Sequence, residues 1–420
     1  MAQLTDDCFA LGKSLMTTHE ALSQINTQTK IIVDIENLAL EKTIGRILAK
    51  DVVSGRAVPS HDNSAVDGFA VCFNDLLKNK DTRLPISGRI IAGHPLQKEV
   101  VPGNAYRIFT GALMPKGTDT VLMQEDCQVE DAMVTIPRGI KRGANRRFSG
   151  EDIKKGSVVL KSGRRLKAQD IGLAASIGCT TLSIYKPLQV ALFSTGDEIC
   201  DLGEDLSAGC IYDSNRYSIG ALLHQLGCII NDLGILTDRA NVIKKSLSVA
   251  AKKNDVIITT AGVSTGEEDH IRQAVSSLGK IHFWRLAIRP GRPIALGQIG
   301  RKPFIGLPGN PVAAMVTFMR FARPALLLMN GAKNVEPSFF KVPANFDYIK
   351  KTGRREWVRA VLESDKMGNG QFLCYNHRDK ETLFVGTNDI NSGQIKTFNS
   401  MGVETVFLGT DDNDAGLVHV

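Results

Sequence analysis

The sequence predicts a multidomain protein of the α/β plus β class, with a central three-layer α/β domain on a mostly parallel sheet. The chain has 420 residues, which at roughly 150 per domain gives about two to four domains. From residue 188 onward, strand-like and helix-like segments alternate. Short β-rich segments divided by Pro and Gly fill residues 55–140, and β-rich sequence returns after residue 330.

The N-terminal part of the chain carries two helical patterns and one β-rich module. Apolar positions near helical spacing predict an amphipathic helix over residues 6–25, and Leu40–Val53 repeats the pattern more briefly. Residues 55–140 are predicted as a separate β-rich module. The apolar segment Ile171–Ile177 is predicted as a short helix, followed by a β segment that ends at Tyr185.

The central part alternates in the manner of a parallel sheet covered by helices. The predicted elements are strand 189–194, helix 217–226, strand 228–236, helix 242–252, strand 256–260, helix 271–278 and the apolar helix 313–329. Ligands of such sheets bind beyond the carboxyl ends of the strands. We therefore expect Thr195–Glu198, Asp238 and the 261–269 loop to lie on one edge.

Composition indicates a soluble protein of a reducing compartment. The first 27 residues lack the basic start of a secretory signal, and no segment is predicted to span a membrane. The eight cysteines form no C-x-x-C pair, which favours free thiols over disulfides or structural zinc. We expect a cytoplasmic location.

The charge balance favours a small anionic ligand over nucleic acid. The net charge is +7, but aromatic residues make up only 6% of the chain and do not interleave with the basic clusters. Stacking on single-stranded bases therefore has little support.

The most informative segment runs from Asp255 to His270. A buried strand over Val256–Thr260 is predicted to lead into a loop whose small residues let backbone N–H groups approach an anion; these are Gly262, Ser264 and Gly266. Glu267, Glu268 and Asp269 would repel a bare phosphate, so the pattern fits Mg²⁺ bridging acids and phosphate. A plain strand–turn–helix connection, with acids favouring the helix start, is the alternative.

Two further turns carry anion-binding chemistry. Arg289 and Arg292 lie on a proline-stiffened turn, where guanidinium groups match tetrahedral oxyanions; solvated surface arginines are the alternative. The Gly306–Pro311 segment leads into the apolar helix, with Asn310 suited to the N-cap and Pro311 to the first helical position. Its glycines also expose helix N–H groups to an anion.

Acidic loops elsewhere have both a functional and a structural interpretation. Asp197 and Glu198 follow a strand where Mg²⁺ ligands would be needed, but a capped turn explains them as well. In Tyr212–Asn215 the capping interpretation is preferred. Asp62 and Asp67 are either catalytic or turn formers. The chain has no H-E-x-x-H, Walker A or G-x-S-x-G motif, which removes the common zinc protease, P-loop and esterase classes.

Taken together, five motifs in a fixed order resemble the molybdopterin molybdenumtransferase family, the MoeA and gephyrin E-domain group. The motifs are His61–Val71, Thr110–Ala112 with Asp119–Glu125, Ser194–Glu198, Ile211–Arg216 and Gly306–Pro311. Weaker matches at Leu40–Val53, Gly150–Asp152 and Gly353–Arg359 keep the same order, so the resemblance spans nearly the whole chain.

The resemblance implies an elongated homodimer of four-domain subunits, with an active site shared between them. The implied domains are a discontinuous linker and dimerisation domain (1–55 and 140–186), a β-rich lid domain (56–139), a molybdopterin-binding α/β domain (187–330) and a small C-terminal β-barrel (331–420). A transient contact with the molybdopterin adenylyltransferase that supplies the substrate is also expected.

The activity implied by the resemblance is Mg²⁺-dependent cleavage of adenylylated molybdopterin, with release of AMP while molybdate enters the pterin dithiolene. Asp62, Thr110, Asp152 and Glu198 are the implied catalytic residues, and Asp238 and Asp269 the leading Mg²⁺ ligands. The implied substrate and molybdate-binding residues are Arg289, Arg292, Pro308, Pro311, Arg354, Ser392, Gly262 and Ser264.

Three positions depart from the family pattern. Arg292 stands where Lys is common, Ala261 where a second small Gly is common, and Ala313 where Ser is common. Arg replaces Lys in charge but not in geometry, and Ala313 removes a hydroxyl donor worth about 1 kcal/mol. The departures at Ala261 and Ala313 leave open a pterin-binding or scaffold paralogue without turnover. The central α/β segment taken alone leaves open a general Mg²⁺-dependent nucleotide transferase.

Overall fold

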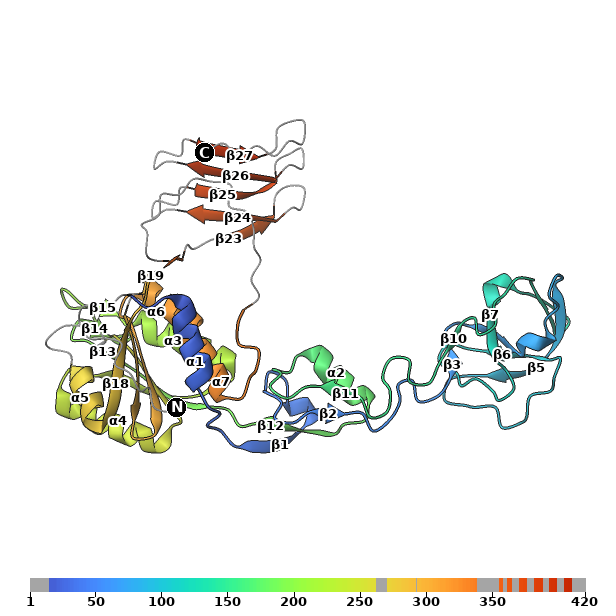
Figure 1. The fold of residues 1–420 in the computed structure, drawn as a ribbon, viewed down its shortest axis with the longest axis horizontal. Helices are drawn as coiled ribbons and strands as arrows, with labels where there is room; N and C mark the ends of the chain where they lie inside the picture. The colour runs from blue at the N-terminus through green and yellow to red at the C-terminus, as the bar shows by residue number, and fades with distance from the viewer. Residues whose placement is uncertain are drawn as a thin grey trace. The chain divides into compact units, whose positions relative to one another are not determined.

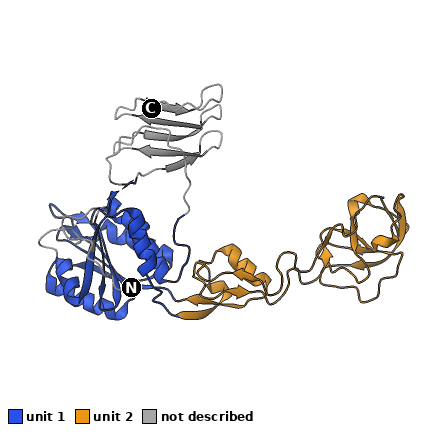
Figure 2. Ribbon diagram, viewed as in Figure 1, with its two compact units in different colours: residues 1–34, 186–420 blue, residues 35–185 orange. Residues whose placement is uncertain are grey.

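The chain divides into two compact units, residues 1–34 with 186–420 and residues 35–185, which Figure 2 colours separately. In the computed structural model the described residues are 15–261, 270–291, 293–337 and 355–357, together with five strands between 361 and 409. Parts of the predicted N-terminal helix and of the 261–269 loop lie outside them.

A six-stranded sheet forms the centre of the first unit, in the order β16-β13-β17-β21-β20-β18 (Figure 1). Its strands are β13 (Gln189–Thr195), β16 (Ile229–Leu236), β17 (Val256–Thr260), β18 (Gly279–Arg285), β20 (Pro293–Ile299) and β21 (Lys302–Leu307). The first four strands in spatial order pair in parallel, as the alternation predicts. The last two pair antiparallel, which the sequence pattern did not indicate.

Helices cover this sheet on both faces. The unit's helices are α1 (Thr18–Gln28), α3 (Ser214–Leu226), α4 (Ala240–Lys253), α5 (His270–Leu278), α6 (Pro311–Thr317) and α7 (Arg323–Met329). Ile243 and Leu247 of α4 and Val275 of α5 pack with Phe193 of the sheet in one buried cluster. The side chain of Leu192 points to the opposite face of the sheet from that of Phe193 and lies against Gly220 of α3.

Local signals fix where these helices begin and end. Asn310 caps α6 by accepting a hydrogen bond from Ala313 N at 3.1 Å, and Pro311 occupies the first turn, so both predictions are confirmed. The helical stretch continues through a π-helical turn, Phe318–Ala322, and Pro324, which has no N–H to donate, follows two residues later. By length and composition Pro311–Met329 could cross a membrane, but 67% of its apolar window is buried inside the fold.

Small ladders complete the first unit. β14 (Ile199–Cys200) pairs in parallel with β15 (Ile211–Tyr212), and β19 (Ile288–Arg289) with β22 (Arg355–Glu356). The C-terminal part contains an antiparallel sheet of five strands: β23 (Val361–Ser364), β24 (Gly370–Tyr375), β25 (Glu381–Thr387), β26 (Gly393–Phe398) and β27 (Glu404–Gly409). The described strands pair only with sequence neighbours, so the implied barrel stays a prediction.

The second unit contains two groups of strands with separate cores. A six-stranded sheet has the order β7-β4-β6-β5-β9-β8. Its strands are β4 (Gly68–Val71), β5 (Thr82–Ile90), β6 (Ala105–Ile108), β7 (Thr120–Met123), β8 (Gln128–Glu130) and β9 (Met133–Ile136). Its two faces bury one cluster around Phe69 and another around Tyr106.

The other core of this unit gathers around Leu48, Leu166 and Ile184. It lies among β1 (Ile35–Ala39), β2 (Val52–Val53), β11 (Val158–Leu160), α2 (Ala168–Ser176) and β12 (Thr181–Tyr185). Helix α2 and strand β12 confirm the predictions for this part. A short ladder joins β3 (Asn63–Ser64) to β10 (Arg146–Arg147). Short 3₁₀ turns occupy Leu40–Lys42, Phe73–Asp75 and Gln124–Asp126.

The brief helical pattern predicted over Leu40–Val53 was wrong. Only its first three residues form a 3₁₀ turn, and Gly45 has a φ of +75°, which is incompatible with a continuing helix. Ile47 and Leu48 form isolated β-bridges with residues 165 and 184, and both are buried. Two consecutive apolar residues are therefore buried against extended segments and do not form one face of a helix.

Gly68 is a position where the second unit tolerates no side chain. A Cβ at Gly68 would lie 1.7 Å from the backbone oxygen of Leu122, because β4 is paired between β6 and β7. We expect Gly68→Ala to destabilise the protein by at least about 2 kcal/mol in urea unfolding. Gly55→Ala is the matched control, since nothing lies within 4 Å of its Cβ position. Equal stability of the two variants would contradict this packing.

Candidate active site

The carboxyl ends of four strands meet at one edge of the central sheet. Thr195 pairs with Leu236, Ser194 with Thr260, and Thr260 with Leu307, so β13, β16, β17 and β21 end side by side. The segments that follow carry Glu198, Asp238, Ala261 and Pro308. The expectation that these strand-end loops share an edge is confirmed for the described residues.

Glu198 follows β13 across a glycine that permits close approach. Gly196 has a φ of +142°, and a Cβ there would lie 2.6 Å from Glu198 Oε2, so the carboxylate lies over the glycine backbone. Ile211 N donates to Glu198 O at 2.8 Å and anchors the main chain. The side chain is exposed and has no hydrogen bond or ion pair to another described residue.

Asp238 follows the end of β16 by two residues. It is half-buried, and its carboxylate also has no hydrogen-bond or ion-pair partner among the described residues. Carboxylate oxygens without partners are the ligands that Mg²⁺ prefers. Asp269, Gly262 and Ser264, the other predicted residues of this edge, lie outside the described residues, as do Arg292, Arg354 and Ser392.

The Arg289 turn packs along one side of α6, from Ala313 to Thr317. A Cβ at Gly291 would lie 2.7 Å from Thr317 Cγ2 and 3.3 Å from Ala313 O, so only glycine permits this contact. The Arg289 side chain is 64% exposed, and its Nη1 lies 3.9 Å from Glu356 Oε1, beyond hydrogen-bond distance. The guanidinium is therefore accessible to an oxyanion.

The loop after β21 holds the neighbouring segments together. Asn215 Nδ2 donates to Gly309 O at 2.7 Å, and Ala261 N donates to Leu307 O at 3.1 Å. A Cβ at Gly309 would lie 3.3 Å from the Cβ of Ala261. Pro308 is buried and Pro311 is exposed, so they shape this loop from its inner and outer sides.

Two buried polar atoms at this edge lack partners among the described residues. They are Thr195 Oγ1, at the end of β13, and Asn215 Oδ1, at the start of α3. Unpaired buried polar groups are costly, so each offers hydrogen-bonding capacity to a polar ligand. The sequence placed Thr195 on this edge and favoured a capping role for Tyr212–Asn215, and the structure confirms a cap at Asp213. It gave no signal that the Thr195 hydroxyl and the Asn215 amide oxygen would be buried without partners, because burial depends on how separate segments pack.

In the second unit, the Asp62 carboxylate forms contacts that hold two neighbouring segments together. Its carboxylate accepts from Ser149 N at 2.7 Å and forms an ion pair with Arg146. The Ser149 N–H, followed by the Arg146 guanidinium, lowers the pKa of Asp62. Asp152 is similarly paired, with Arg147 Nη2 at 2.7 Å.

Thr110 is joined to Asp67, which the sequence left open between catalysis and turn formation. The backbone N–H and the hydroxyl of Thr110 both donate to Asp67 Oδ1 at 2.7 Å. These bonds lower the pKa of Asp67 and keep it ionised. A cleft of about 300 Å³ lies beside this loop pair, lined by His61, Asn63, Gly111 and Leu113 among others.

The fold and this edge define a class of protein: a multidomain α/β plus β protein whose central sheet presents acidic and glycine-rich loops at the carboxyl ends of its parallel strands. Residues 16–178 match the MoeA N-terminal region (domain I and II), and residues 191–327 match the probable molybdopterin binding domain.

Named relatives support the same assignment. The chain is 38% identical to a molybdopterin molybdenumtransferase of Haemophilus influenzae over 84% of this chain and 88% of the relative. One from Nostoc sp. is also 38% identical, over 77% and 76%. A crystal structure of the molybdopterin biosynthesis MoeA protein from Pyrococcus horikoshii covers 90% of this chain and 97% of its own, with 26% identity and a TM-score of 0.72. The chain belongs to the molybdopterin molybdenumtransferase family, which is a family of enzymes.

The backbone conformation of Ala261 is strained. Ala261 has a φ of +74°, a left-handed conformation that costs a residue with a Cβ about 1–2 kcal/mol. Glycine would remove this strain, although its freedom in the unfolded chain offsets about 0.5–1 kcal/mol. We expect Ala261→Gly to raise the unfolding temperature by about 1–3 °C in calorimetry. Ala92→Gly, at a residue without positive φ, should lower it; a lower unfolding temperature for Ala261→Gly would contradict the strain.

Proposed function

We propose that this protein cleaves adenylylated molybdopterin in a Mg²⁺-dependent reaction, releases AMP and inserts molybdate into the pterin dithiolene. The observation that carries the proposal concerns Glu198 and Asp238, two carboxylates without hydrogen-bond or ion-pair partners among the described residues. Both lie at the sheet edge within residues 191–327, which match the probable molybdopterin binding domain. An accessible guanidinium, Arg289, lies on a turn packed against the helix that starts beyond the same edge.

The residues of this edge suit a hard divalent cation. Asp238, with Asp269 from the neighbouring loop, would hold Mg²⁺, and Glu198 would complete the acidic edge. When bound, Mg²⁺ neutralises phosphate oxygens and polarises phosphorus toward attack. Thr195 Oγ1 and Asn215 Oδ1, which are buried and lack partners among the described residues, would orient the polar groups of the pterin nucleotide.

The molybdate would bind to the arginines. Arg289, with Arg292, Arg354 and Ser392, supplies donors to a doubly charged tetrahedral oxyanion. Pro308 and Pro311 restrict the loop beside them, and Gly262 and Ser264 supply backbone N–H groups to phosphate. In the transfer, the two dithiolene sulfurs replace one oxide of molybdate, which leaves as water with both thiol protons. Water adds across the phosphoanhydride bond whose cleavage yields AMP.

The second unit would contribute Asp62, Thr110 and Asp152. Asp62 and Asp152 are paired with arginines, so their role would be to keep their loops in one conformation. Thr110, fixed by Asp67, would lie on the loop surface that meets the nucleotide. We further propose a cytoplasmic homodimer in which one subunit completes the site of the other. A transient contact with the adenylyltransferase would deliver the substrate.

The central experiment measures AMP released from adenylylated molybdopterin with Mg²⁺ and molybdate. We expect turnover by the wild type, and a loss of about 100-fold or more for Asp238→Asn and Glu198→Gln, because the charge that neutralises the cation is removed. Asp255→Asn is the matched control. Asp255 directly precedes β17, at the end of the sheet opposite to Glu198 and Asp238, and is paired with Lys302, so its replacement should leave the rate unchanged.

A second variant separates molybdate binding from cleavage. Arg289→Gln removes a charged donor worth about 1.5–3 kcal/mol, so the KM for molybdate should rise about 10-fold or more. The rate at saturating molybdate should change less. Absence of AMP release from the wild type, together with tight pterin binding, would replace the proposal by a pterin-binding scaffold. Competition by unrelated nucleotides would favour a general nucleotide transferase.

A further inference from the structure

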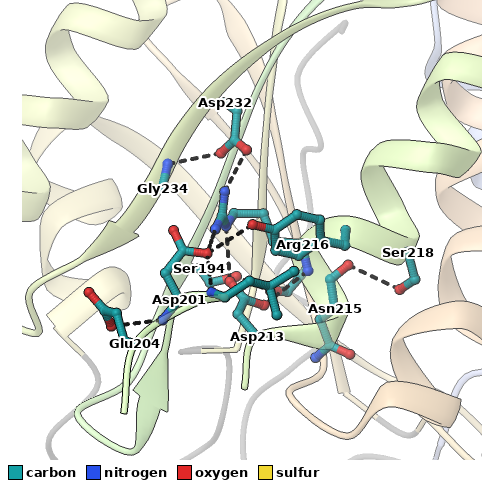
Figure 3. A network of polar contacts seen from close by, with 12 residues as sticks. Ser194, Asp201, Glu204, Asp213, Asn215, Arg216, Ser218, Asp232 and Gly234 are labelled. Carbon is teal, nitrogen blue, oxygen red and sulfur yellow. Dashed lines mark hydrogen bonds and ion pairs between the residues drawn. The ribbon is translucent and has the colours of Figure 1, made fainter. Parts of the chain in front are cut away.

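One buried guanidinium joins three carboxylates beside the acidic edge. Arg216, in the first turn of α3, is 5% exposed and lies among Asp201, Asp213 and Asp232 (Figure 3). Its Nε is 3.0 Å from Asp213 Oδ2, its Nη2 is 2.6 Å from Asp201 Oδ1, and its Nη1 is 2.5 Å from Asp232 Oδ2. The Tyr217 ring covers the guanidinium, with its centroid 4.9 Å away.

This cluster is built to keep one cation in place. Burial alone would lower the pKa of Arg216, but the hydrogen bond to Asp213 and the charges of Asp232 and Asp201 raise it above its ordinary value. Asp213 is buried, whereas the side chains of Asp201 and Asp232 are 40% and 48% exposed. Removing the guanidinium would leave Asp213 as an uncompensated buried charge.

The ion pair between Arg216 and Asp201, called the Asp201 arm below, anchors the segment that carries Glu198. Asp201 lies three residues after Glu198, directly after β14. Its Oδ1 accepts from Leu202 N and Tyr217 Oη at 2.9 Å as well as from Arg216. The same segment is tied to β15 by the bond from Ile211 N to Glu198 O. Arg216 therefore fixes the far end of the loop on which Glu198 stands.

The ion pair between Arg216 and Asp232, called the Asp232 arm below, anchors the strand that leads to Asp238. Asp232 lies in β16, where the pairing with β13 shifts register between Leu192 and Ser194. Its Oδ1 accepts from Gly234 N at 2.9 Å, and Gly234 has a φ of +71°, so Asp232 closes a β-bulge. A bulge re-aims the residues that follow it, and Asp238 follows four residues later.

We propose that Arg216 is a positioning residue that sets the relative placement of Glu198 and Asp238 through its Asp201 and Asp232 arms. The inference rests on the proposed function of those two acids. The planar guanidinium serves three acceptors in fixed directions, which a lysine ammonium cannot do. Outer contacts that orient metal ligands are commonly worth about 10- to 100-fold in activity.

The test removes each arm separately. Asp201 and Asp232 are both partly exposed, so Asp201→Asn and Asp232→Asn should fold, whereas Arg216→Lys serves as the conservative replacement at the centre. Each single variant should lower kcat for AMP release about 10- to 100-fold and raise the Mg²⁺ concentration for half-maximal rate. Arg216→Lys should lose both arms and be affected at least as strongly. Asp255→Asn again serves as the unaffected carboxylate control.

Double variants distinguish positioning from general stability. If the Asp201 arm acts through Glu198, Asp201→Asn should change the residual single-turnover rate of Glu198→Gln by less than about twofold. Asp232→Asn should likewise be nearly silent in the Asp238→Asn background, but not in the Glu198→Gln background. A merely structural cluster would instead give losses that multiply in every background.

Hydrogen exchange gives a readout that does not depend on turnover. Asp201→Asn should speed amide exchange in residues 198–212 and leave residues 233–239 unchanged. Asp232→Asn should speed it in residues 233–239 and leave residues 198–212 unchanged. If the wild-type protein released no AMP, both the proposed function and this inference would be rejected. Active wild type, combined with unchanged rates or multiplicative losses in the variants, would overturn the inference alone.

Discussion

The parallel pairing of β13 with both of its neighbours is the constraint on which the rest of the site depends. Ser194 is in register with Thr260, and Thr195 with Leu236, so the chain leaves the sheet at the same level in three strands. A buried contact of 2.7 Å between the Ser194 and Thr260 hydroxyls joins the two strands near their ends. Loops that are far apart in sequence are thereby brought to one edge.

Close backbone approach then determines how tightly those loops pack. Gly196 makes room for the Glu198 carboxylate, Gly291 for α6, and Gly309 for Ala261. A side chain at Gly291 would push its turn away from α6, and one at Gly196 would displace the Glu198 carboxylate. Ala261 keeps a left-handed conformation despite its Cβ, which indicates that the packing of this edge holds the backbone there. The apolar cluster around Phe193 supports the edge from below.

Ion pairing divides the acids considered above into two groups. Asp62, Asp152, Asp201 and Asp232 are paired with arginines and hold loops or bulges in place. Glu198 and Asp238 have no such partner among the described residues and retain their ligand capacity. An ion-paired carboxylate already has a cation beside it, so the four paired acids hold their loops, whereas the oxygens of Glu198 and Asp238 stay available to a ligand.

The sequence by itself determined the features that depend on neighbouring residues: the alternating strands and helices of the central domain, the caps at Asp213 and Asn310, and the common edge of the parallel strands. It mispredicted Leu40–Val53 and did not indicate the antiparallel β18 and β20, because burial there comes from distant strands. Only the tertiary structure decided which acids meet Arg216, since Asp201 and Asp232 approach it through a loop and a bulged strand rather than along one helix. Local propensities are encoded within a few residues, whereas charge pairing depends on how separate segments pack in space.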